Sequence, residues 1–291
     1  SALALILVLL CGGLDRAYAD AANDLKEAGW AARAGNSQGA IDLYTRAIDS
    51  GELPADQAYE ARLGRGIAYA LNKQTDQAIA DLSEVIRLAP DMRAYFARGN
   101  VYFATGQCAK ARDDYDALYR TSPRGFQSQN ALYRNFRPIL RLGTTKFCLG
   151  DYAAAAVDFA RALPRGQSRQ ADEQYAAIWL YLALGRQGKD ERASLAKQVP
   201  TTATTLDWPA PVVSYLLDGM PLDQLLAEAA GEADATLRRR KYCEAYFYAG
   251  EDALLRGAAQ NATDLLKTAI TACDGYTEEY QVAKAELQRV R

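Results

Sequence analysis

Small and aromatic residues recur at helical spacing in the middle of the chain. Residues 59–90 and 93–123 carry the same residue types when one stretch is laid on the other with an offset of 33. Each stretch reads Gly-x-x-Tyr, then Ala-x-x-x-Leu or Ala-x-x-x-Tyr, and each ends at a proline. The matched pairs are Gly66 and Gly99, Tyr69 and Tyr102, Ala78 and Ala111, and Pro90 and Pro123. This pattern predicts two antiparallel helices in each stretch.

The order of these residues resembles the tetratricopeptide repeat, a helix pair of about 34 residues. The glycine and the alanine lie where the two helices cross most closely, because a larger side chain would hold their axes too far apart. The proline ends the second helix, since it lacks an N–H and disfavours helix in the residue before it. One pair cannot bury its apolar face alone, so the prediction is an all-α superhelical solenoid of such pairs. An ordinary helical bundle is the alternative.

The rest of the chain extends this array with interruptions. We expect five repeats over residues 20–199, with Trp30 of the first repeat as a packing residue and an insertion near 124–134. Residues 200–291 are expected to form further helices of the same kind, including a final repeat at 243–274 and a charged capping helix.

The first residues have the features of a secretory signal. Ala2–Leu10 is an apolar run too short to span a bilayer, and Ala17-Tyr18-Ala19 fits a cleavage site before Asp20. A basic leader and an initiator Met are missing, so we expect the sequence to begin inside a signal peptide of residues 1–19. Cys11 offers a lipoprotein alternative, although Leu10 before it is larger than such signals prefer. We therefore expect a periplasmic protein, on the membrane only if Cys11 is lipidated.

Composition narrows the function classes. The chain has 34 basic and 36 acidic residues, which gives no general field for nucleic acid or anionic membrane. It has no histidine, which removes Ser-His and Cys-His catalysis and His-ligated zinc. The run Arg238–Lys241 is interpreted as the solvated face of a helix. We expect a binding protein without enzymatic activity, cofactor or metal.

Four cysteines follow the proposed cleavage site, and an exported protein meets oxidising conditions. The repeat register places Cys243 at the start of one helix and Cys273 at the end of its antiparallel partner. It also places Cys108 at the start of one helix and Cys148 at the end of the next. We expect the disulfides Cys243–Cys273 and Cys108–Cys148, with four buried free thiols as the alternative.

A partner-binding groove is predicted on the first helices of the third and fourth repeats. Positions 2, 5, 6, 9, 12 and 13 of such repeats point to the concave face. There they place Arg93, Phe96, Asn100, Phe103, Arg137, Leu140, Arg141, Thr144 and Phe147. Arginine holds carboxylates bidentately, asparagine bonds an extended backbone, and phenylalanine offers an apolar contact. Arg137 and Arg141 resemble two positions of the carboxylate clamp of chaperone-tail-binding repeats, but its preceding Lys and Asn are missing. The alternative is that the arginines are solvated and the phenylalanines pack inside.

Residues 207–291 resemble the C-terminal part of NlpI-type periplasmic tetratricopeptide lipoproteins. The shared features are a Trp-Pro helix ending in Tyr-Leu-x-x-Gly, a short Leu-Leu helix, Cys-Glu-Ala-Tyr-Phe-Tyr-Ala-Gly at 243–250 and Glu-Glu-Tyr at 278–280. The resemblance implies a non-catalytic adaptor, a homodimer formed through N-terminal helices, and partners that are C-terminal processing proteases and peptidoglycan endopeptidases. This chain departs from that family at the front, where it lacks a good lipobox.

Two functions follow as expectations. The first is a periplasmic adaptor that binds proteins or peptides and recruits a C-terminal processing protease or a cell-wall hydrolase in cell-envelope maintenance. The alternative is a structural subunit of an envelope or secretion assembly, in which the solenoid is scaffolding.

Overall fold

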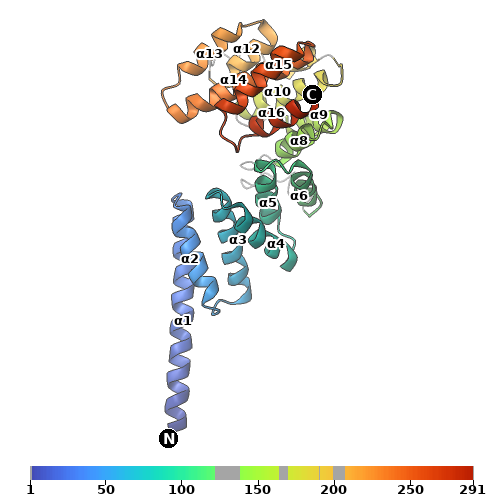
Figure 1. The fold of residues 1–291 in the computed structure, drawn as a ribbon. Coiled ribbons are helices and arrows are strands. Elements are labelled where there is room, and N and C mark those ends of the chain that lie inside the picture. The colour runs from blue at the N-terminus through green and yellow to red at the C-terminus, as the bar shows by residue number, and fades with distance from the viewer. Residues whose placement is uncertain (1, 122–137, 164–169, 190, 199–206, 291) are drawn as a thin grey trace. The chain divides into compact units, whose positions relative to one another are not determined.

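The computed structural model describes residues 2–121, 138–163, 170–189, 191–198 and 207–290. The regular elements in these ranges are all α-helices (Figure 1). The insertion expected near 124–134 lies outside the described residues. By contact density the chain divides into two compact units, residues 1–101 with 117–122 and residues 102–116 with 123–291. We describe each unit by itself.

The first unit is built from successive antiparallel helices. They are α1 (Ala2–Arg33), α2 (Ser37–Asp49), α3 (Ala55–Leu71), α4 (Thr75–Leu88) and the part of α5 (Met92–Ala104) up to residue 101. Helix α2 packs between α1 and α3, and α3 packs against α4. The core between α1, α2 and α3 consists of Ala28, Ala40, Ile41, Tyr44, Ala61 and Ala68. Apart from Tyr44, the buried residues of this core are small or branched, as the repeat pattern requires.

Gly66 and Gly143, each in the first helix of a repeat, mark close helix crossings, as their place in the pattern predicts. A Cβ on Gly66 would lie 2.9 Å from Cγ of Leu82 on α4. Farther along, a Cβ on Gly143 would lie 2.5 Å from Cε1 of Phe159. Real Cβ atoms are not found this close to another carbon, so these helices could not approach each other with any larger residue.

The second unit contains the remaining helices. They are the start of α6 (Cys108–Thr121), α8 (Pro138–Cys148), α9 (Tyr152–Ala162), α10 (Gln170–Gly185), α11 (Glu191–Gln198), α12 (Ala210–Asp218), α13 (Leu222–Ala230), α14 (Ala235–Leu255), α15 (Ala259–Ala272) and α16 (Glu278–Arg289). Helix α14 begins before Cys243, where the sequence pattern placed its start. Its extension is capped by Asp234, whose carboxylate accepts a hydrogen bond from the Leu237 N–H at 2.8 Å.

An aromatic cluster forms the centre of the second unit. Trp179 of α10 contacts Phe147 and Phe159 from the fourth repeat, with ring centroids 5.4 and 5.7 Å away. On its other side it contacts Phe247 and Tyr248 of α14. These rings join residues far apart in the sequence into one core.

The C-terminal helix does not simply end the array. Helix α16 packs against α14 and α15, its neighbours in sequence, and also against α8 of the fourth repeat (Figure 1). The last helix of the unit therefore covers part of its first complete repeat. None of the helices in the described ranges is long and apolar enough to cross a membrane.

Candidate partner-binding surfaces

The groove residues predicted on α5 lie partly within an ion-pair cluster. The Arg93 guanidinium donates two hydrogen bonds to Glu60, at 2.9 and 2.7 Å, and also bonds Asp91 at 2.7 Å. The Tyr59 hydroxyl donates to the same Asp91 carboxylate at 3.0 Å, and burial together with this bond raises the pKa of Tyr59 to about 12. Phe96 and Asn100 are half-buried on the same helix. Arg93 is therefore already neutralised by carboxylates of its own chain.

The two phenylalanines expected to contact a partner are core residues instead. Phe103 is 1% exposed and Phe147 is fully buried. The Phe147 ring packs edge-on against Tyr152 at 4.9 Å as well as against Trp179. The prediction was wrong for these two residues, because a large ring at this position gains more by burial between helices than on an open face.

On α8, the described groove residues are buried or paired within the chain. Arg141 forms an ion pair of 2.8 Å with Glu278 at the start of α16. Leu140 and Thr144 are buried, and the Thr144 hydroxyl donates to the Arg141 carbonyl at 3.0 Å. Arg137 lies outside the described residues. The prediction of a groove on α8 that is open to a partner was therefore wrong for the described residues.

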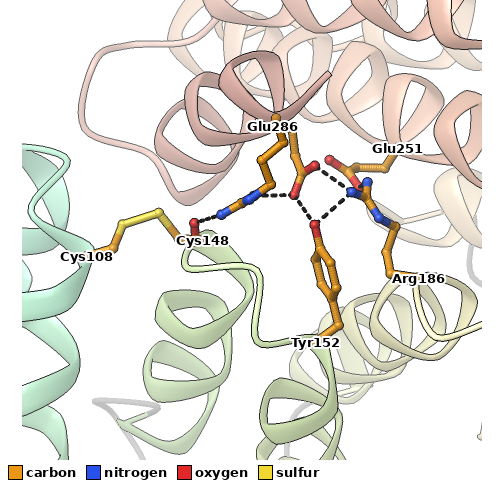
Figure 2. Close-up of polar contacts among 7 residues, drawn as sticks. Cys108, Cys148, Tyr152, Arg186, Glu251 and Glu286 are labelled. Carbon is orange, nitrogen blue, oxygen red and sulfur yellow. Dashed lines mark hydrogen bonds and ion pairs between the residues drawn. A yellow bond between two sulfur atoms is a disulfide. The ribbon is translucent and has the colours of Figure 1, made fainter. Parts of the chain in front are cut away.

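A buried polar network fixes α16 in this place (Figure 2). We call it the C-terminal network; its members are Tyr152, Arg186, Glu251, Glu286 and Arg289. The Glu286 carboxylate, fully buried, accepts hydrogen bonds from Tyr152 at 2.9 Å, Arg186 at 2.8 Å and Arg289 at 2.6 Å. Arg186 also donates to the Tyr152 hydroxyl at 2.7 Å, so α9, α14, α16 and the residue that follows α10 meet in one cluster.

Glu251 is a member of this network whose hydrogen bonding is incomplete. It is fully buried, its Oε2 is 3.4 Å from Arg186, and its Oε1 has no hydrogen-bond partner in the described residues. Burial and repulsion from Glu286 raise the pKa of Glu251 well above its usual range, against the opposing effect of Arg186 and Arg289. Glu251 therefore keeps its proton well above the pH at which an exposed glutamate loses it.

Two further contacts hold the ends of α16. The Gln281 side chain donates to the carbonyls of Ala104, at 2.6 Å, and Gly275, at 2.8 Å. The Arg289 guanidinium donates to the carbonyl of Cys148. The carbonyls of Ala104 and Cys148 lie at helix ends, where they have no partner within their own helix.

The structure contains the two disulfides expected from the helix register. Cys108 pairs with Cys148 across a Cα–Cα distance of 6.3 Å, and Cys243 pairs with Cys273 across 4.6 Å. The first joins the start of α6 to the end of α8, where Arg289 binds. The second joins α14 to the residue that follows α15.

The basic run on α14 is used within the chain. Arg239 donates to the carbonyls of Ala272 and Cys273, and so caps the end of α15. Arg240 pairs with Glu244 at 2.9 Å, and Lys241 pairs with Glu232 at 2.8 Å. These contacts agree with a structural role for the run on its helix.

An open face in the first unit was not anticipated from the sequence. Arg33, at the end of α1, is exposed, and Leu71, at the end of α3, is 65% exposed. Trp30, expected to be a packing residue, is 51% exposed with the Lys26 ammonium 4.7 Å from its ring centre, so that expectation was wrong.

Comparison with known proteins agrees with this architecture. Residues 25–92 and 72–126 match the model of a family described as "Tetratricopeptide repeat". A crystal structure of a tetratricopeptide repeat protein from Parabacteroides merdae aligns over 91% of this chain and 99% of its own, with 14% identity and a TM-score of 0.58. The TPR domain of P58(IPK) aligns over 87% of this chain and 73% of its own, with 16% identity and a TM-score of 0.31. No curated protein matches the chain.

The likeness to the Parabacteroides merdae protein is one of fold alone, at its level of identity. Within the described residues, no group of three or more His, Cys, Asp or Glu is placed to hold a metal ion. Repeats of this kind present helix faces to other proteins and typically have no catalytic site. Residues 25–126 therefore match the model of the tetratricopeptide repeat, and the chain has the fold of a tetratricopeptide-repeat solenoid.

Proposed function

We propose that this protein is a non-catalytic adaptor that binds protein segments on the face of its first unit. One contrast carries the proposal. On α8, Arg141, one of the residues predicted to meet a partner, is paired with Glu278 of α16. In the first unit, Arg33 and Leu71, at other positions expected on the concave face of such repeats, keep exposed side chains.

We further propose that the protein acts in the periplasm. The two disulfides support an oxidising compartment, and residues 2–19 have the composition of a secretory signal. Export with cleavage before Asp20 would leave a periplasmic protein, whereas lipidation at Cys11 would anchor it to a membrane. The N-terminal residue of the exported protein distinguishes these two outcomes.

The proposed clients are a C-terminal processing protease or a peptidoglycan hydrolase. The support is the resemblance of residues 207–291 to NlpI-type adaptors, and this part of the chain forms α12 to α16 in the second unit. In such a role the adaptor holds the protease and its substrate close together, so that their encounter becomes effectively intramolecular. Homodimer formation belongs to the same proposal.

Affinity capture tests the proposal directly. The exported protein, purified from the periplasm, serves as bait for a periplasmic extract, and mass spectrometry identifies what it retains. Recovery of a processing protease or a cell-wall hydrolase in substoichiometric amounts supports the adaptor. Recovery of secretion or envelope-assembly subunits in stoichiometric amounts favours a structural subunit instead, and recovery of no partner contradicts both functions.

A further inference from the structure

In the first unit, α1, α2 and α3 form a small surface that the repeat pattern leaves uncovered. We call it the Arg33–Tyr44 face; it consists of Gly29 and Arg33 on α1, Tyr44 on α2, and Gly64 on α3. Gly29 and Arg33 lie one and five residues after Ala28, and Ile67 and Leu71 lie at the same distances after Gly66 in the next repeat. The face therefore occupies the positions at which repeats of this type meet extended segments.

The Tyr44 hydroxyl lies in the space beside a glycine of α3. The residue is 7% exposed, and its ring lies so close to α3 that a Cβ on Gly64 would be 2.5 Å from its hydroxyl oxygen. This hydroxyl forms no hydrogen bond with any residue that the structure describes. The hydroxyl oxygen is not among the buried side-chain atoms that lack a partner, so solvent reaches it and it is free to bond a ligand or water.

The charges around the hydroxyl favour an anionic ligand. Burial raises the pKa of Tyr44, Arg33 lowers it and Glu60 raises it, so both charges lie near the hydroxyl and Tyr44 remains a donor at neutral pH. The Glu60 carboxylate is engaged by Arg93 through two hydrogen bonds. Arg33, in contrast, forms no ion pair within the described residues. The groups left over for a ligand are therefore hydrogen-bond donors.

We propose that the Arg33–Tyr44 face binds the acidic side chain of an extended protein segment. Its carboxylate accepts hydrogen bonds from the Arg33 guanidinium and the Tyr44 hydroxyl, in the charge-assisted geometry that arginine favours. The absence of a Cβ at Gly29 and Gly64 lets the segment approach the helices closely. Arg33 on the face and Leu71 on the next repeat are both exposed. A bound segment can therefore continue beyond the face and need not end there. This inference rests on the proposed function and names the chemistry of the partner.

The probe is a phage library of random octapeptides attached to the coat protein through their C-termini, so that no peptide has a free carboxyl end. Selection on the wild-type protein is expected to enrich peptides with Asp or Glu at one fixed position. Synthetic copies with blocked ends should bind Arg33→Gln about tenfold more weakly or worse, because a hydrogen bond to a charged group is lost. Tyr44→Phe, which keeps the ring, should bind several-fold more weakly. Arg87→Gln, an exposed control on α4 of the same unit, should bind like wild type.

Each other outcome overturns the inference. Enriched peptides without a common acidic position, equal binding by Arg33→Gln, or no enrichment at all would show that the face does not select a carboxylate. Enrichment only in a second library with free C-termini would show that it holds a chain end instead. A thermal melt by circular dichroism checks that each variant is folded. Partner capture by wild-type protein together with an unselective face would leave the proposed function standing without this inference.

Discussion

Replacing Glu251 with glutamine should change how stability depends on pH. Glu251 is fully buried beside Glu286 and Arg186, and burial raises its pKa well above the usual range. The folded protein therefore holds a proton on Glu251 that the unfolded chain releases near pH 4.5. Wild-type stability from this group is complete at low pH and falls as pH rises towards the folded pKa. Glu251→Gln removes the titration, so its stability relative to wild type should rise with pH.

The magnitude follows from one proton. While Glu251 is protonated in the folded state and ionised in the unfolded state, the stability of wild type falls by about 1.4 kcal/mol for each pH unit. For as long as Glu251 stays protonated in the folded state, the free energy of unfolding of Glu251→Gln should therefore rise relative to wild type by the same amount for each pH unit. We also expect a difference in stability that does not change with pH. The amide group replaces the Glu251 carboxyl group, whose Oε1 has no hydrogen-bond partner among the described residues. Only the change of the stability difference with pH tests whether Glu251 is protonated; the part that is constant with pH does not.

Urea unfolding followed by circular dichroism at pH 5, 6 and 7 measures this slope, with tryptophan fluorescence as a second probe to check that one transition is observed. Both proteins keep every other titrating group, including the buried Glu279, so those contributions cancel to first order. Glu228→Gln, on the exposed side of α13, serves as a control whose pH dependence should match wild type. A difference between Glu251→Gln and wild type that stays constant over this range would refute a protonated Glu251.

Three further predictions concern the packing and the C-terminal helix. Gly143→Ala should lower the free energy of unfolding by about 1–3 kcal/mol through overpacking, while Gly231→Ala, at a site with ordinary contact distances, should have little effect in the same urea titration. Replacing Cys108 and Cys148 together by serine should lower the free energy of unfolding by about 4 kcal/mol, the value that chain entropy gives for a loop of 40 residues. A loss under about 1 kcal/mol would contradict a formed disulfide. Arg141→Glu should repel the start of α16 and speed amide hydrogen exchange in residues 278–289, and unchanged exchange would show that this ion pair does not hold the helix.

The helix pairs were predictable because their determinants are local. Gly66 and Gly143 lie at close helix crossings, and the sequence shows both the glycine and the large residue that faces it one helix later. The disulfides followed from the same register, since antiparallel neighbours bring defined helix ends together. The short helix at 222–230 also matches its sequence pattern, with Pro221 before it.

The candidate surfaces were harder to predict because they depend on distant contacts. Nothing near Arg141 in the sequence indicates that Glu278 will pair with it, and Tyr152 meets Glu286 across 134 residues. Repeat position alone also does not separate an exposed ring from a buried one, and Phe147 was misplaced for this reason. The Arg33–Tyr44 face was not predicted because the first repeat is irregular. Its signal was the glycine at position 64, opposite the tyrosine.

The return of α16 to the fourth repeat changes the order in which the molecule can fold. In an open solenoid each repeat needs only its neighbours, so folding can begin anywhere and spread. Here Gln281 bonds the Ala104 carbonyl across 177 residues, and contacts of such sequence separation form slowly because a long loop must close first. The first unit can fold from local contacts while the chain is being made. The second unit cannot bury Glu286 or satisfy Arg186 until its last helix has been synthesised, so this half of the protein stays open to chaperones and proteases for longer.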